Sequence, residues 1–252
     1  MNRLAIGSIL SRSFSLLGKN LVPFGAVVAV LHFPLLPLRL YQQSLTVGGP
    51  VPQEVSLRFV AAEVLLSMTI GAITCSALTH AVLSRLDRDH GAPMSIADSI
   101  RTAMRRLGRV IGVSLAVGVL TSVGMLACCI PGIILSCRYA VAAPAVVVEG
   151  HGVGGSLRRS VELTAGSRWD IFAVYMVTGL IIGAVGGIPA TLSVVILGPL
   201  GFDVMHVASL VFVWLCGLVG SVFWLLVQVT TYHDLRLLRD GPTRDEVARA
   251  FD

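Results

Sequence analysis

The chain has 252 residues, of which 55% are hydrophobic and only 13% are charged. An ordinary soluble domain has about 25% charged residues, so this composition excludes a soluble globular protein and predicts an all-α integral membrane protein. The formal net charge is +5. It could favour nucleic acid as a partner, but no basic stripe is interleaved with aromatic residues, and we expect no nucleic-acid binding.

Two apolar runs in the first third of the chain, residues 21–40 and 57–84, are each long enough for one transmembrane helix. About 20 apolar residues are needed to cross the hydrocarbon core of a bilayer. Pro34 and Pro37 lie near the end of the first run. Because each proline removes a backbone hydrogen-bond donor, we expect them to kink or end that helix.

The third apolar run, residues 110–149, is long enough for two helices. It is interrupted only by Arg138 and by the adjacent Pro131 and Gly132. A single helix of this length would measure about 60 Å, twice the thickness of the hydrocarbon core. We therefore predict two spans joined by a turn near the segment CCIPG.

Two further runs, residues 171–197 and 204–231, complete a prediction of six transmembrane helices. With both termini in the cytoplasm, sixteen of the 19 Lys and Arg residues fall in cytoplasmic segments. The outer segments hold only Arg39 and Arg58, and Arg138 lies within a span. Positive residues accumulate on the cytoplasmic side of membrane proteins, so we expect a multi-pass protein with both ends inside.

Short amphipathic segments precede the first, third and fifth spans. In the segment before the first span, four apolar side chains at helical spacing lie opposite serines and an arginine. The apolar residues are Ile6, Leu10, Phe14 and Leu17. In the segment before the fifth span, Leu157 and Val161 lie opposite the charged residues Arg158, Arg159 and Glu162. We therefore expect three transmembrane hairpins, each preceded by a cytoplasmic-face amphipathic helix, in repeats of approximately residues 4–94, 95–152 and 153–242.

The amphipathic segments can be interpreted in two ways. They could lie in the inner headgroup layer with their arginines near anionic phosphates, or they could cap the helix bundle without touching lipid. In either case residues 1–242 form one transmembrane domain. Thr243 and Glu246 form a capping box, which predicts a short cytoplasmic helix over residues 243–252.

Spaced residues in the second half of the chain carry a family resemblance. They are an IPG turn at residues 130–132, Arg138, Pro144, Glu149, Arg158, Arg159, Ser160, Trp169, Tyr232, Asp234 and Arg236. In this pattern the chain resembles the membrane-domain family named after glycerophosphoryl diester phosphodiesterases.

The resemblance implies a stand-alone membrane domain of a bacterial inner membrane. It also implies a cytoplasmic motif made of Glu149, Arg158, Arg159, Trp169, Tyr232, Asp234 and Arg236. The chain has no room for the eight strand–helix units of a phosphodiesterase barrel and no set of metal-binding carboxylates. We therefore expect no phosphodiesterase activity.

Arg138 is the candidate for a functional or structural charge inside the bilayer. A charge at mid-helix costs about 2.5–3.5 kcal/mol on insertion scales, so its side chain should face the bundle interior and have a partner. In straight spans, Arg138 and Glu63 would lie about 12 and 9 Å below the outer surface. These depths predict an ion pair, either a structural one or one in which Arg138 serves as a ligand for an anion or a lipid headgroup.

Other residue patterns indicate packing rather than chemistry. Gly179, Gly183 and Gly187 share one face of the predicted fifth span and predict close helix packing, within the bundle or in a homodimer. The five cysteines have neither zinc nor redox spacing, so we expect no disulfide and no metal. No cofactor is indicated, and no nucleophile is paired with a base.

Three classes of function are compatible with these patterns. The favoured one is a non-enzymatic protein that binds membrane lipids, including anionic headgroups, or scaffolds a protein partner. The alternative is a small transporter or lipid-moving protein with a site near Arg138. A membrane-embedded enzyme is the weakest interpretation, because the sequence contains no acid–base constellation.

Overall fold

The computed structural model describes residues 4–38, 40–41, 53–86, 96–197 and 203–241. About 92% of the structure is helical, and none of the described residues lies in a strand. The elements are α1 (Ile6–His32), α3 (Gln53–Leu86), α4 (Ile96–Ala127), α5 (Cys129–Arg138), α6 (Ala142–Glu149), α7 (Val153–Thr164), α8 (Arg168–Ile182), the π-helical turn η1 (Gly183–Gly187), α9 (Ile188–Leu197) and α10 (Asp203–Asp240). The predicted helix over residues 243–252 lies outside the described residues.

Six helical segments of the described chain are long and apolar enough to cross a membrane, as the sequence predicts. They are Ile6–His32, Leu57–Val82, Leu107–Ala127, Cys129–Glu149, Arg168–Gly187 and Val211–Asp240. The chain is therefore a helical, multi-pass membrane protein.

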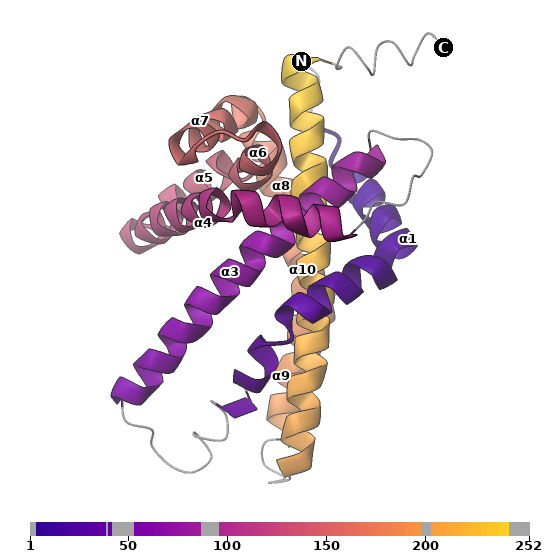
Figure 1. The fold of residues 1–252 in the computed structure, drawn as a ribbon, viewed down its shortest axis with the longest axis vertical. Coiled ribbons are helices and arrows are strands. Elements are labelled where there is room, and N and C mark those ends of the chain that lie inside the picture. The colour runs from indigo at the N-terminus through magenta and orange to yellow at the C-terminus, as the bar shows by residue number, and fades with distance from the viewer. Residues whose placement is uncertain (1–3, 39, 42–52, 87–95, 198–202, 242–252) are drawn as a thin grey trace.

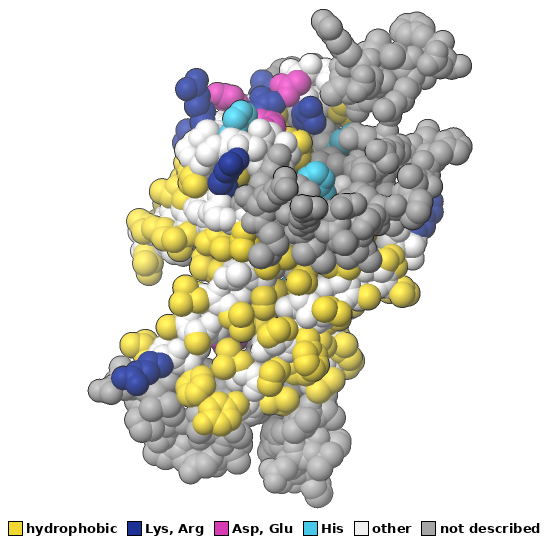
Figure 2. All heavy atoms as spheres, viewed as in Figure 1, with side chains coloured by type: hydrophobic (Ala, Val, Ile, Leu, Met, Phe, Trp, Pro, Cys, Tyr) yellow, Lys and Arg dark blue, Asp and Glu magenta, His cyan; other side chains and the backbone are white. Residues whose placement is uncertain are grey.

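The helices run in different directions relative to the long axis of the molecule (Figure 1). α10 runs along the long axis of the molecule, and α8, η1 and α9 pack beside it. α3 is inclined to this axis, whereas α4 and α5 lie across it. α6 and α7 lie near the upper end of the view, and charged side chains gather there, while hydrophobic side chains cover the part below (Figure 2).

α1 is kinked near its middle. Asn20 has non-helical dihedral angles (φ −128°, ψ 18°), and Pro23 cannot donate the helical hydrogen bond to the carbonyl of residue 19, which accounts for the kink. The helix ends at His32, two residues before Pro34, as predicted. On the N-terminal side of the kink, the buried hydroxyls of Ser13 and Thr230 lie 3.0 Å apart and join α1 to α10.

α4 and α5 pack closely against each other. The break between them is Cys128, whose backbone is extended (φ −174°, ψ 149°). A Cβ added to Gly132 would lie 2.8 Å from the backbone nitrogen of Met125, and one added to Gly124 would lie 3.0 Å from the Cα of Gly132. The predicted turn near the segment CCIPG is thus at Cys128, the first residue of that segment. Pro131 lies in the first turn of α5, where a missing backbone hydrogen-bond donor costs little.

The predicted fourth span is not one helix. Residues 139–141 separate α5 from α6, because Pro144 has no N–H for the carbonyl of Ala140, four residues earlier. This carbonyl instead accepts hydrogen bonds from the Tyr175 hydroxyl at 3.1 Å and the Gln228 amide at 2.8 Å. The break is therefore stabilised by side chains of α8 and α10.

The predicted amphipathic helices differ from expectation in the faces they bury. α7 buries Ser156, Ser160, Leu163 and Thr164, whereas the predicted apolar residues Leu157 and Val161 are half-buried. In α1, Ile9 is fully buried and Phe14 is 47% exposed. Small hydroxyl side chains let α7 approach the bundle closely, so α7 covers the end of the bundle.

The predicted glycine packing surface meets no neighbouring atom in the part of the chain that the structure describes. Gly179, Gly183 and Gly187 are exposed, and a Cβ added to any of them would meet no atom within 4 Å. Of the two expectations, packing within the bundle is not seen among the described residues, and packing in a homodimer stays a prediction. Helical spacing identifies a shared face, but it does not identify the neighbour of that face.

Candidate functional site

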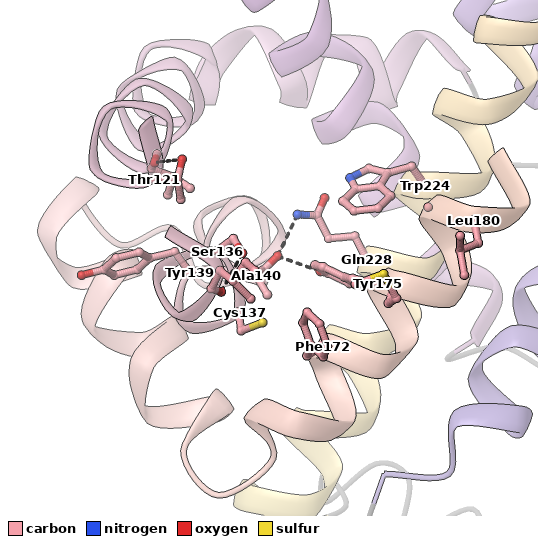
Figure 3. Close-up of a pocket in the computed structure, with 14 residues that line it drawn as sticks. Thr121, Ser136, Cys137, Tyr139, Ala140, Phe172, Tyr175, Leu180, Trp224 and Gln228 are labelled. Carbon is pink, nitrogen blue, oxygen red and sulfur yellow. Dashed lines mark hydrogen bonds between the residues drawn. The ribbon is translucent and has the colours of Figure 1, made fainter. Parts of the chain in front are cut away.

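A cavity of about 500 Å³ lies between α4, α5, α8 and α10 (Figure 3). This volume is within the range of about 300–1,000 Å³ that is typical of small-molecule sites. The lining residues are Val117 and Thr121 of α4, Ile133, Ser136 and Cys137 of α5, Tyr139 and Ala140 of the break, Phe172, Tyr175, Met176, Gly179 and Leu180 of α8, and Trp224 and Gln228 of α10.

Four polar side chains of the cavity wall donate hydrogen bonds to backbone carbonyls. The hydroxyl of Thr121 donates to the carbonyl of Val117 at 2.8 Å, and that of Ser136 donates to Ile133 at 2.8 Å. Tyr175 and Gln228 both donate to the carbonyl of Ala140. What remains is a largely apolar wall, with the side-chain oxygen of Gln228 turned away from Ala140 (Figure 3).

The cavity opens on the outer surface of the helix bundle through α8. Met176, Gly179 and Leu180 line it and are also exposed, Leu180 to 65%. In a membrane-spanning segment this surface faces hydrocarbon rather than water. The opening of the cavity therefore lies among exposed residues of a candidate membrane span.

A second feature, the polar cap, lies at the upper end of the molecule. We define it as Arg12, Glu149, His151, Arg159, Tyr232, Asp234 and Asp240. Glu149 is its centre, because this carboxylate accepts hydrogen bonds from Arg159 Nε at 3.0 Å and from the Tyr232 hydroxyl at 2.9 Å. His151 Nδ1 lies 3.3 Å from the same carboxylate.

Two further ion pairs connect the cap to α10. Arg159 bonds to Asp240 as well as to Glu149. Arg12 of α1 forms a bidentate pair with Asp234, at 3.0 and 2.8 Å. Burial alone would lower the pKa of the Arg159 guanidinium, but its hydrogen bonds to Asp240 and Glu149 raise that pKa above its ordinary value. The cap thus joins α1, α6, α7 and α10.

The structure brings three residues of the proposed cytoplasmic motif together: Glu149, Arg159 and Tyr232. Asp234 pairs with Arg12 instead, and Arg158 pairs with Glu162 on the exposed side of α7. Among the remaining motif residues, Trp169 is 82% exposed and Arg236 is half-buried on α10. Sequence reasoning missed the roles of Arg12 and Asp240, because pairs between distant segments leave no local spacing signal.

Arg138 is not part of the cavity wall. It is the last residue of α5, and its carbonyl accepts hydrogen bonds from the hydroxyls of Ser160 at 3.1 Å and Thr164 at 3.2 Å. Its Nε is buried and has no hydrogen-bond partner among the described residues. The structure therefore places Arg138 beside α7.

The predicted pair of Arg138 with Glu63 is not among the ion pairs of the described residues. Glu63 is half-buried on α3, and α3 packs on α4 and α6. The depths that we calculated assumed straight spans. The fourth span is instead broken directly after Arg138, and α5 lies across the molecule (Figure 1).

No group of three or more His, Cys, Asp or Glu residues within the described ranges could hold a metal ion. Cys75 and Cys137 are buried, Cys216 is half-buried, and Cys128 and Cys129 are exposed beside the break between α4 and α5. All five are free thiols.

Comparison of the chain with protein-family models, with curated proteins and with solved structures found no match.

Proposed function

We propose that this protein is a non-enzymatic membrane protein that binds a membrane lipid, with an acyl chain in the cavity between α4, α5, α8 and α10. The observation that carries the proposal is the cavity itself. Its volume is about 500 Å³, its wall is largely apolar, and it opens through Met176, Gly179 and Leu180 on a surface that faces hydrocarbon. An acyl chain entering from the bilayer would exchange one apolar environment for another and would gain packing contacts with the wall.

The polar cap is proposed to face the cytoplasm. Arginines of α7 and of the end of α10 lie at this end of the molecule, and the cytoplasmic side of membrane proteins is enriched in Lys and Arg. This orientation would place both termini inside an inner or plasma membrane. Anionic headgroups would then lie near the exposed Arg158 and Arg168.

The alternative of a transporter has less support. A transport pathway for a charged or polar substrate needs polar groups that are free to bind it. Here four polar side chains of the cavity wall, those of Thr121, Ser136, Tyr175 and Gln228, bind backbone carbonyls, and Arg138 lies outside the wall. A retained lipid, or a scaffold that presents the polar cap to a partner, fits this arrangement better.

Membership of the membrane-domain family described above is also a proposal. The contact of Glu149 with Arg159 and Tyr232 supports it, since Tyr232 is 83 residues from Glu149 and still joins the two other motif residues in one cluster. The proposal carries no phosphodiesterase activity with it.

Filling the cavity should remove the bound lipid. In Gly179→Leu, the new side chain projects from a position that lines the cavity and where a Cβ meets no atom within 4 Å. We expect the variant to fold and to copurify with at least about fivefold less lipid, because the four added carbon atoms of leucine occupy space that a bound chain would otherwise fill. Mass spectrometry of lipid extracted from the purified protein measures this ratio.

Gly217→Leu is the matched control. Gly217 is an exposed glycine of α10 that does not line the cavity, and a Cβ there also meets no atom within 4 Å. Its lipid content should equal that of the wild type. Equal lipid content in wild type and both variants would contradict the proposal.

A further inference from the structure

We infer that the α4–α5 pair does not cross the bilayer, but enters the leaflet on the side of the polar cap and returns to that side. In this arrangement Cys128 and Cys129 lie in the hydrocarbon of one leaflet. The pair is then a membrane-insertion surface whose partner is the acyl region of that leaflet. This inference is independent of lipid binding in the cavity.

The direction of the pair is the first observation. α10 runs along the long axis, and the polar cap marks its upper end, so α10 gives the direction in which the chain crosses the membrane (Figure 1). α4 and α5 lie across this direction. Their tip is at the level of the upper half of α3, far above the lower end of α3, where Arg58 lies.

The base of the pair is held at the polar cap. Arg109 of α4 donates a hydrogen bond to the carbonyl of Gly150 at 2.7 Å, next to Glu149. At the other end, the carbonyl of Arg138 is bound by two hydroxyls of α7. Both ends of the α4–α5 pair are therefore attached to the same side of the molecule.

The charge distribution does not require the tip to reach the opposite side. The outer segments predicted from the sequence hold Arg39 and Arg58, and neither lies between α4 and α5. The segment from Gly118 to Ser136 contains no Lys, Arg, Asp or Glu at all. The preference for positive residues inside is thus satisfied equally by a crossing and by a returning pair.

The backbone at the break between α4 and α5 is hydrogen-bonded within the tip, which lowers the cost of immersing it in lipid. Unbonded N–H and C=O groups are costly in hydrocarbon. At Cys128 the N–H donates to the carbonyl of Gly124 at 3.1 Å, and the carbonyl accepts from the N–H of Gly132 at 3.4 Å. Pro131 has no N–H, which removes one of the donors that the first turn of α5 would otherwise leave unbonded.

The side chains of the tip are also apolar. Leu126 is 87% exposed, Ile130 is 66% exposed and Val123 is 60% exposed. Trp and Tyr are enriched where spans meet the membrane–water interface, and neither occurs between Arg109 and Arg138. A tip that reached the outer aqueous phase would expose these leucine and isoleucine side chains to water.

The inference also accounts for the position of Arg138. In a returning pair, the end of α5 lies close to the polar cap, and Arg138 is near the headgroup layer rather than deep in the bilayer. Its Nε has no hydrogen-bond partner among the described residues, and a charged side chain costs less near the headgroup layer than at the middle of the bilayer. No deep intramembrane partner is then required.

Labelling of the native thiols tests the inference in the full-length protein in intact membranes. Cys128 and Cys129 are the exposed cysteines of the described chain, so their reaction with a membrane-impermeant maleimide reports access to water. We expect them to react at least about tenfold more slowly from either side of the membrane than after denaturation, because hydrocarbon suppresses formation of the reactive thiolate. The Cys128→Ser/Cys129→Ser variant identifies their share of the labelling.

Two reporter positions calibrate the labelling rates. Gly154→Cys places a thiol on the exposed side of α7, where a Cβ meets no atom within 4 Å, and Leu57→Cys places one on the 69% exposed position near the start of α3. Each should react from one side only, and the two from opposite sides. If Cys128 and Cys129 react from the same side as Leu57→Cys and at a similar rate, the pair crosses the membrane and the inference is overturned.

Rapid reaction from the side of Gly154→Cys would also overturn the inference, since the tip would then lie in water beside the polar cap. Slow labelling is checked for depth with a fluorophore attached to Cys129 in Cys128→Ser. Lipids brominated along the acyl chain should quench it more strongly than an aqueous quencher does. Stronger quenching by the aqueous quencher contradicts immersion.

Discussion

Glu149→Gln should lower the free energy of unfolding by about 2–3 kcal/mol. The Glu149 carboxylate accepts hydrogen bonds from Arg159 and Tyr232 and lies near His151. Its side chain is only 15% exposed and that of Arg159 is 21% exposed, so water screens their attraction weakly. The amide would keep an acceptor for Tyr232 but would leave the Arg159 charge with Asp240 alone. Unfolding in mixed detergent micelles measures the change.

Glu162→Gln is the matched control for this substitution. Glu162 also pairs with an arginine of α7, but the side chains of Arg158 and Glu162 are 84% and 51% exposed. Exposed pairs contribute about 0–1 kcal/mol, so the free energy of unfolding should change by less than about 0.5 kcal/mol. Similar losses in the two variants would show that Glu149 is not the centre of the polar cap.

Gly132→Ala should lower the free energy of unfolding by about 2 kcal/mol. A Cβ at this position would lie 2.8 Å from the backbone nitrogen of Met125 and 2.6 Å from its Sδ. The sulfur can move, but the backbone cannot, so α4 and α5 would have to separate. This cost exceeds the gain of about 1 kcal/mol that alanine normally brings to a helix in place of glycine.

Gly118→Ala supplies the comparison for that variant. Gly118 lies in the same helix pair, on α4, and a Cβ there meets no atom within 4 Å. We expect the free energy of unfolding to stay constant or to rise. If both alanine variants are as stable as the wild type, the close approach of α4 and α5 at Gly132 is incorrect.

The helical segments could be predicted from the sequence because they depend on local properties. The 110–149 run is too long for one span, and the break falls at Cys128. Pro34 marks the end of α1 by removing a backbone donor. In each case the length of an apolar run or a single proline determines the outcome, and no distant contact is involved.

The break after Arg138 had a local signal that the sequence interpretation left unused. Pro144 removes the donor for the carbonyl of Ala140, which predicts a helix interruption near residue 140. The two side chains that bind this carbonyl, Tyr175 and Gln228, come from α8 and α10. Their arrival at Ala140 depends on tertiary packing, so the cavity could not be predicted.

The residues of the polar cap were predictable only in part. Glu149, Arg159 and Tyr232 belong to the pattern that carries the family resemblance, but the pattern does not give their mutual distances. The pairing of Arg12 with Asp234 spans 222 residues and has no counterpart in local spacing. The depths from which the Arg138–Glu63 pair was expected assume straight spans, whereas the fourth span is broken directly after Arg138.

The most direct test of lipid binding is an experimental density map of the wild-type protein in a lipid bilayer. We expect elongated density of acyl-chain width in the cavity, beside Phe172 and Tyr175, extending outward past Gly179. A cavity without such density, or one closed by inward movement of Met176 and Leu180, would contradict the account.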